Sequence, residues 1–264
     1  MIHNDVHTWV RSLKAAGLSP ETIDLRQRHV HRALAQIGQP LDDLSERDLI
    51  DWFAAQEWKP ATRRSYRASL QLFFRWRANA GLGANLADNL PSVAVPRAIP
   101  RPASDQIILD AIRTAPPRVQ LMMELMAYGG LRRGETSRVH SRNLNGEWLE
   151  VTGKGGHTRL VPLPPHLCNQ IRDARGWLFP GDIDGHLSAP YVGKLVSRHL
   201  PTGITAHMLR HRFATVTYRR SKDIRAVQTL LGHAKLDTTM IYVGLDDDAR
   251  RAAAGGAWSL DSAA

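Results

Sequence analysis

The sequence predicts a mainly α-helical protein with a small β-sheet, divided into two domains. Helical hydrophobic periodicity fills the first 87 residues, a proline-rich stretch follows, and two strand-like segments flank a glycine turn within residues 147–162. A chain of 264 residues with 43% hydrophobic residues is long enough to build two cores. We expect a helical domain at 1–87, a linker at 88–103, a mixed α/β domain at 104–245 and a tail at 246–264.

Four helices fit the first domain. The second begins after Ser19, an N-cap residue, with Pro20 at the first helical position. The third begins near Ser45, and the fourth runs over about 60–80. Their periodicity predicts buried faces made of Val6, Trp9, Val10 and Leu13 in the first helix, Leu49, Trp52 and Phe53 in the third, and Tyr66, Leu70, Phe73, Phe74 and Arg77 in the fourth.

A basic stripe lies nearly opposite the apolar face of the fourth helix. Arg64, Arg67 and Arg75 form it, and six basic residues with no acidic one occur from Lys59 to Arg77. A solvated helix face is one interpretation. The lack of any compensating carboxylate favours the other, in which these three arginines contact DNA.

The second domain mixes helices with one hairpin. The strands are expected within 147–162, around the turn Gly153-Lys154-Gly155-Gly156. The chain breaks again at Gly232-His233 and resumes around 238–243. Helical patterns occupy 104–114, 119–129, 165–174, 189–199, 205–220 and 224–231.

Charge composition points to a polyanionic partner. Lysine plus arginine total 35 against 25 acidic residues, which gives a net charge of +10. Only six of the basic residues are lysines, and arginine is the side chain that grips phosphate bidentately. No uncharged run is long enough for a membrane span and the first 16 residues lack a secretory signal, so we expect a cytoplasmic protein. The single cysteine, Cys168, excludes an internal disulfide and is expected to be a buried thiol.

Three short motifs could carry chemistry, and each must be compared with another interpretation of the same residues. Arg132 and Glu135 have the spacing of a helix surface pair. His207 and His211 have the spacing of helical zinc ligands, but Met208 stands where a zinc hydrolase has glutamate. The glycine turn at Lys154 lacks the Ser or Thr and the first glycine of a nucleotide-binding loop. Neither a metal nor a nucleotide cofactor is therefore expected.

Taken in order, these motifs closely resemble one family, the tyrosine recombinases of the phage integrase and Xer type. The resemblance spans almost all of the second domain, and the first looks like the family's SAM-like core-binding domain by architecture. It implies a C-shaped clamp around double-stranded DNA. It rests on Gly-Leu-Arg132-x-x-Glu135, Gly153-Lys154-Gly-x-x-x-Arg159-x-Val-Pro-Leu, His207-x-Leu-Arg210-His, Leu-Leu-Gly-His233 and Thr-Thr-Met-Ile-Tyr242.

The resemblance also implies a role for each matching residue. Tyr242 would be the nucleophile that forms a 3′-phosphotyrosyl bond, and Lys154 the general acid for the leaving 5′-oxygen. Arg132 and Arg210 would hold the scissile phosphate. The remaining roles are proton transfer by His207, a hydrogen bond to a phosphate oxygen from His233, and structural support near the site from Glu135.

The family further implies a homotetramer acting on two DNA sites, monomeric or weakly associated without DNA, with an accessory DNA-bending or directionality protein as a further partner. The tail would dock on a neighbouring protomer through Trp258, or else fray. A type IB topoisomerase shares the same chemistry, and a DNA-binding regulator that has lost its catalysis is a non-enzymatic alternative. Integration, excision and dimer resolution all remain open as the biological task.

Overall fold

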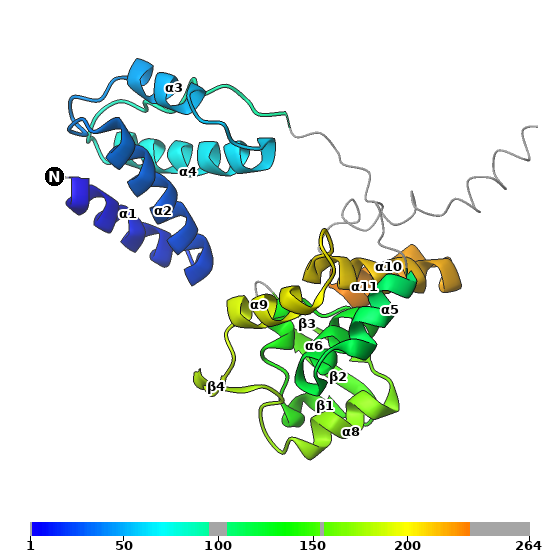
Figure 1. Cartoon of the computed structure of the whole chain (residues 1–264). Coiled ribbons are helices and arrows are strands. Elements are labelled where there is room, and N and C mark those ends of the chain that lie inside the picture. The colour runs from blue at the N-terminus through cyan, green and yellow to red at the C-terminus, as the bar shows by residue number, and fades with distance from the viewer. Residues whose placement is uncertain (1, 95–104, 154–155, 233–264) are drawn as a thin grey trace, which may run out of the picture. The chain divides into compact units, whose positions relative to one another are not determined.

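The structure is a computed structural model that describes residues 2–94, 105–153 and 156–232 (Figure 1). The chain divides into two compact units, residues 1–98 and 99–264. Each unit has a hydrophobic core of its own.

The first unit contains four helices, and α2, α3 and α4 begin where the sequence predicts. They are α1 (Ile2–Ala15), α2 (Pro20–Ile37), α3 (Glu46–Ala54) and α4 (Pro60–Asn79). The Ser19 hydroxyl accepts a hydrogen bond from the backbone N–H of Thr22, and Ser45 forms a reciprocal capping box with Asp48. These caps satisfy N–H groups that have no partner within the helix, which fixes where α2 and α3 begin.

Aromatic side chains fill the core of this unit. Trp9 of α1 meets Phe73 of α4 edge to face, with ring centroids 5.2 Å apart. Trp58 stacks on Tyr66, which stacks in turn on His29 of α2 at centroid distances of 3.9 and 3.8 Å. All the apolar residues expected on the buried faces of α1, α3 and α4 are buried, so the predicted core of the first unit is confirmed.

Arg77 lies on the buried face of α4, as its position in the periodicity predicts. Its Nε donates to Asp5 of α1 at 3.0 Å, and its Nη2 donates to Asp42, before α3, at 2.8 Å. The guanidinium therefore ties α4 to two other parts of the unit. Ala87 and Leu90 are also buried in this core, so the unit extends past residue 88, where the linker is predicted to begin.

The second unit is built around a three-stranded antiparallel sheet and a buried helix. The sheet has the order β1 (Leu144–Asn145), β2 (Trp148–Thr152), β3 (Thr158–Pro162), with Leu149 opposite Val161. The helices are α5 (Asp105–Thr114), α6 (Pro117–Tyr128), α7 (Arg133–Thr136), α8 (Pro165–Asp173), α9 (Ala189–His199), α10 (Ala206–Ser221) and α11 (Ile224–Leu231), with the 3-10 turn η1 (Ser141–Asn143) and the strand β4 (Pro180–Ile183) between them.

Helix α6 lies at the centre of the second unit, packed against α5, α9 and α10 (Figure 1). Its residues Met122, Met123, Leu125 and Met126 are all buried, so most of the surface of this helix is covered by its neighbours. Helix α11 packs against β3, which brings the end of the described chain to the hairpin. Cys168 is buried in α8, as predicted.

No helix in the described ranges is long and apolar enough to cross a bilayer.

Candidate active site

Three of the six residues expected to be catalytic lie in the described part of the chain, and the fold brings them together. Arg132 directly precedes α7, and His207 and Arg210 lie in the first turns of α10. All three line one pocket. Lys154, His233 and Tyr242 lie outside the described residues.

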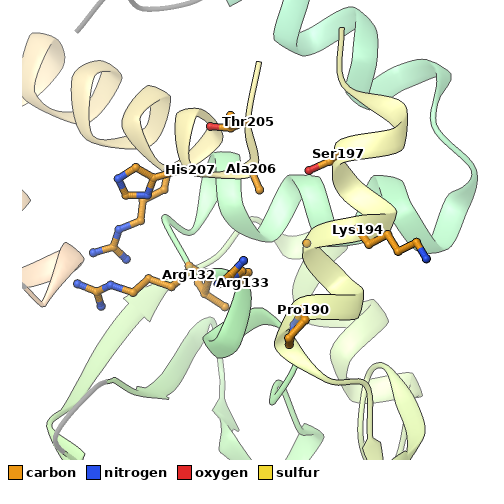
Figure 2. Close-up of a pocket in the computed structure, with 11 residues that line it drawn as sticks. Arg132, Arg133, Pro190, Lys194, Ser197, Thr205, Ala206 and His207 are labelled. Atoms are coloured by element: carbon orange, nitrogen blue, oxygen red, sulfur yellow. The ribbon is translucent and has the colours of Figure 1, made fainter. Parts of the chain in front are cut away.

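The pocket has a volume of about 640 Å³ and lies between α7, α9 and the start of α10 (Figure 2). Arg133 and Lys194 are cations that line the pocket in addition to Arg132 and Arg210, and none of the 11 described residues that line it is acidic. Figure 2 shows Arg132 and His207 extending on the same side of the pocket from different elements, whereas Lys194 points away from them. The lining therefore favours an anionic ligand.

Arg132 is held in place yet remains available to a ligand. Its Nη1 donates to Oε1 of Glu135 at 2.7 Å, and its backbone N–H donates to Oε2 at 2.8 Å. Its side chain is 37% exposed, against 2% for that of Glu135. No acceptor among the described residues bonds Nε or Nη2 of Arg132, so these donors are free to bind an anion.

Glu135 is buried at the centre of an arginine network, so its interpretation as half of a surface pair is wrong. Arg159 of β3 donates to both carboxylate oxygens, at 3.0 and 2.7 Å, and Arg210 lies 3.6 Å away. Burial alone would raise the pKa of Glu135, but the hydrogen bonds and charge of Arg159, followed by the backbone and side-chain hydrogen bonds of Arg132, outweigh it and lower the pKa to about 2. The carboxylate therefore stays ionised at every physiological pH.

Arg210 is almost fully buried and is fixed by backbone carbonyls. Its Nη1 donates to the carbonyl of Gly130 at 2.5 Å, and its Nη2 to that of Leu231 at 2.6 Å. Gly130 has a φ of +64°, and a Cβ there would clash with the ring of Phe213 on α10. Only glycine therefore lets this carbonyl reach Arg210.

The surroundings of His207 disfavour its protonated form. Burial, followed by the charges of Arg210 and Arg132, lowers its pKa below the usual 6.5. The ring of His211 lies edge to face with it at 4.4 Å, and burial with the charges of His207 and Arg210 lowers the pKa of His211 to about 4. Both shifts favour the neutral imidazole. In the described ranges no group of three or more His, Cys, Asp or Glu could hold a metal ion.

The segments that lead to the undescribed site residues both touch this network. A Cβ on Gly153 would lie 3.3 Å from Oε1 of Glu135 and 3.7 Å from Nη1 of Arg132, so the hairpin turn approaches the network directly before Lys154. Helix α11 ends on the carbonyl that Arg210 holds, immediately before Gly232 and His233.

Sequence reasoning assigned no role to Arg133, Lys194 or Arg159. The first two line the pocket, and Arg159 belongs to the motif that follows Lys154. A second arginine directly after Arg132, and a lysine in a chain with few lysines, were the available signals for the pocket residues.

The basic stripe of α4 separates into two kinds of arginine. Arg64 and Arg75 are exposed. Arg67 instead donates through Nε to the carbonyl of Leu90 at 2.9 Å and through Nη1 to Gln71 at 3.0 Å, so its guanidinium holds the chain that follows α4. DNA contact by the three arginines stays a prediction, and Arg64 and Arg75 are the two whose side chains are open to it.

Comparisons with known proteins identify the family. A family model described as the phage integrase family matches residues 103–249. The chain is 30% identical to a tyrosine recombinase XerC from Nitrobacter winogradskyi over 94% of this chain and 91% of that protein. It is 32% identical to a XerC from Mesorhizobium japonicum over 90% of each, and 30% identical to a tyrosine recombinase XerA from Thermococcus kodakarensis over 87% and 86%.

Solved structures share the fold. A lambda integrase dimer bound to a COC′ core site gives a TM-score of 0.73 at 20% identity, over 91% of this chain and 76% of that one. The XerH site-specific recombinase bound to palindromic difH gives 0.69 at 21% identity, over 88% and 78%. The predicted fold class, a helical domain followed by a mixed catalytic domain of the tyrosine-recombinase type, is confirmed. The chain belongs to the phage integrase family, and its function is that of a site-specific tyrosine recombinase.

Proposed function

We propose that the protein cleaves and rejoins duplex DNA through a covalent bond between Tyr242 and a 3′-phosphate. The phenolic oxygen attacks phosphorus, the bond from phosphorus to the 5′-oxygen breaks, and Lys154 protonates the leaving oxygen. The reverse attack by a 5′-hydroxyl reseals a strand, so the energy of one phosphodiester is kept for the next. The observation that carries this proposal is the pair Arg132 and Arg210, which lie next to one buried carboxylate and line a pocket whose described lining residues include no acid.

The described residues suit this reaction electrostatically. Negative charge grows on the non-bridging oxygens during attack, and fixed guanidinium donors stabilise it without reorganising. Loss of one such donor typically costs on the order of 3 kcal/mol in the barrier, or about 10²-fold in rate. His207, neutral because of its lowered pKa, can take the phenolic proton, which His⁺ could not do. We assign His233 a hydrogen bond to a phosphate oxygen.

We further propose a homotetramer on two DNA sites, monomeric or weakly associated in the absence of DNA, that acts in the cytoplasm. One structural neighbour is a lambda integrase tetramer bound to a Holliday junction. The C-terminal segment with Trp258 would dock on a neighbouring protomer, and an accessory DNA-bending or directionality protein would set the direction of the reaction.

Covalent adduct formation tests the proposed chemistry. Nicked duplexes tiled from DNA that flanks the gene are incubated with protein in EDTA and resolved on a denaturing gel. We expect a protease-sensitive adduct with wild type and with the control Tyr218→Phe, whose tyrosine lies on α10, but none with Tyr242→Phe. An adduct that persists in Tyr242→Phe would disprove this nucleophile. Tight binding with no adduct from wild type would favour a regulator without catalysis.

Salt dependence tests the DNA contact of the first unit. Removing a side chain that binds one phosphate reduces the slope of log K against log salt by about 0.9, so Arg64→Ala with Arg75→Ala should reduce it by about two. The matched control is Arg28→Ala with Arg47→Ala, two exposed arginines that already pair with Asp24 and Asp51. An unchanged slope in the first double variant would exclude this face of α4 from the interface.

A further inference from the structure

The geometry points to Arg159 as a positioning residue of the recombinase site: its one guanidinium fixes both the carboxylate that holds Arg132 and the end of α11, from which the chain continues to His233 and Tyr242. The effect of Arg159 on DNA cleavage rests on the proposed function. Its structural half, the fixing of α11, stands on the contacts of Arg159 alone.

All three nitrogen atoms of the Arg159 guanidinium are used. Nη1 and Nη2 donate to the two oxygens of Glu135 at 3.0 and 2.7 Å, and Nε donates to the carbonyl of Leu230 at 2.7 Å. The side chain is only 6% exposed and rises from β3, where Arg159 pairs with Val151. Its donors are engaged by protein acceptors, and Arg159 is not among the described residues that line the pocket, so any role in the reaction passes through its partners.

The first partner is the carboxylate that orients Arg132. Without Arg159, Glu135 would keep one bond from the Arg132 side chain and one from its backbone, on different oxygens. A bidentate guanidinium holds both oxygens in one plane, which sets the direction from which Oε1 receives Arg132. Misplacing a phosphate ligand by about 1 Å is enough to cost on the order of 10²-fold in rate.

The second partner is the last turn of α11. The carbonyl of Leu230 accepts from Arg159, and that of Leu231 accepts from Arg210. Two consecutive carbonyls at the end of the helix, where none has a partner within the helix, are therefore bonded by the same arginine network. Gly232 then turns the chain at a φ of +63°, and a Cβ there would lie 3.0 Å from Cδ of Arg159. The chain therefore leaves α11 in contact with this arginine, one residue before His233.

A purely stabilising role makes a different prediction. Removing one partner of a buried ion pair costs most stability when the other charge is left without compensation. In Arg159→Met, Glu135 still pairs with Arg132 and lies near Arg210, so no charge is left alone. If Arg159 serves stability only, this variant loses at most stability, and its folded form should cleave DNA at the wild-type rate.

The deciding experiment compares binding with cleavage in the full-length protein, on the nicked duplex that wild type cleaves. We expect Arg159→Met to bind DNA within about threefold of wild type and to form adduct roughly 10- to 100-fold more slowly at saturating protein. Arg159→Lys, which keeps the charge and one bond to Glu135, should recover part of the rate. The control is Arg172→Met, which removes an exposed arginine that also bonds a carbonyl of another element, that of Gly146.

A wild-type cleavage rate in Arg159→Met, or equal losses in binding and cleavage, would overturn the catalytic half of the inference. If wild type forms no adduct, that result counts against the proposed function. Hydrogen exchange without DNA still tests the structural half, the fixing of α11. We expect faster amide exchange over 224–232 in Arg159→Met and, should that variant not fold, in Arg159→Lys. Unchanged exchange there, or the same increase in Arg172→Met, would refute it.

Discussion

Neutralising Glu135 should destabilise the second unit by an amount that depends on pH. The carboxylate is 2% exposed and accepts from Arg132 and Arg159, with Arg210 at 3.6 Å. Glu135→Gln keeps the size of the side chain but removes the charge that compensates these guanidinium groups. The effect should therefore be electrostatic rather than a packing defect.

The magnitude follows from the pKa of Glu135, which lies at about 2 in the folded protein against 4.5 for an ordinary glutamate. Because the folded pKa is the lower one, ionisation stabilises the fold fully above pH 4.5, and this stabilisation is lost as the pH falls towards 2. The difference corresponds to about 3 kcal/mol at pH 7, and roughly half of it remains at pH 3.

Urea unfolding followed by hydrogen exchange in peptides of α6 and α10 reports on the second unit alone. We expect wild type to exceed Glu135→Gln by about 3 kcal/mol at pH 7, with the gap narrowing as the pH approaches 3. Glu150→Gln, at an exposed position of β2, should show no comparable gap. A gap that is the same at pH 7 and pH 3 would refute the electrostatic reasoning.

Two further predictions concern buried positions elsewhere. Arg77→Met should lower the unfolding free energy of the first unit by about 1–3 kcal/mol, because two partly exposed aspartates lose their partner. Arg75→Met, at an exposed position of the same helix, should have little effect. Urea unfolding followed by hydrogen exchange in peptides of α1 distinguishes the two variants. Gly130→Ala should lower the unfolding free energy of the second unit by about 3 kcal/mol or more, since the new methyl group meets the ring of Phe213. Gly146→Ala, where φ is +60° and the added Cβ meets no other atom, should lower it by only about 1 kcal/mol. Equal shifts in thermal unfolding for the two alanine variants would contradict the steric argument.

Much of the fold could be predicted from the sequence, because many helix boundaries depend on local chemistry. Ser19 with Pro20, and Ser45 with Asp48, begin helices through contacts within three residues. The helix predicted at 189–199 has those bounds in the structure. Short elements such as α7, β1 and β4 were missed, since two to four residues are too few for a period to appear.

The site was only partly predictable, for a related reason. The motifs identify Arg132, His207 and Arg210, and the structure places all three around one pocket. Spacing alone makes Glu135 a surface residue, however, because its burial depends on Arg159, 24 residues further along the chain. Arg67 likewise donates a hydrogen bond to the carbonyl of Leu90, 23 residues further along the chain, and no local pattern could show this contact.

Counting charges in the Glu135 network gives a reason for its composition. Three guanidinium groups surround one carboxylate, so these four described side chains carry a net charge of +2. In the proposed reaction a bound phosphodiester brings one negative charge, and the pentavalent state that follows brings two. The charge of the network therefore exceeds that of the bound phosphodiester. It equals in magnitude only the charge of the pentavalent state, which has the highest energy. Such a site favours the step across the barrier more than the binding of DNA that precedes it.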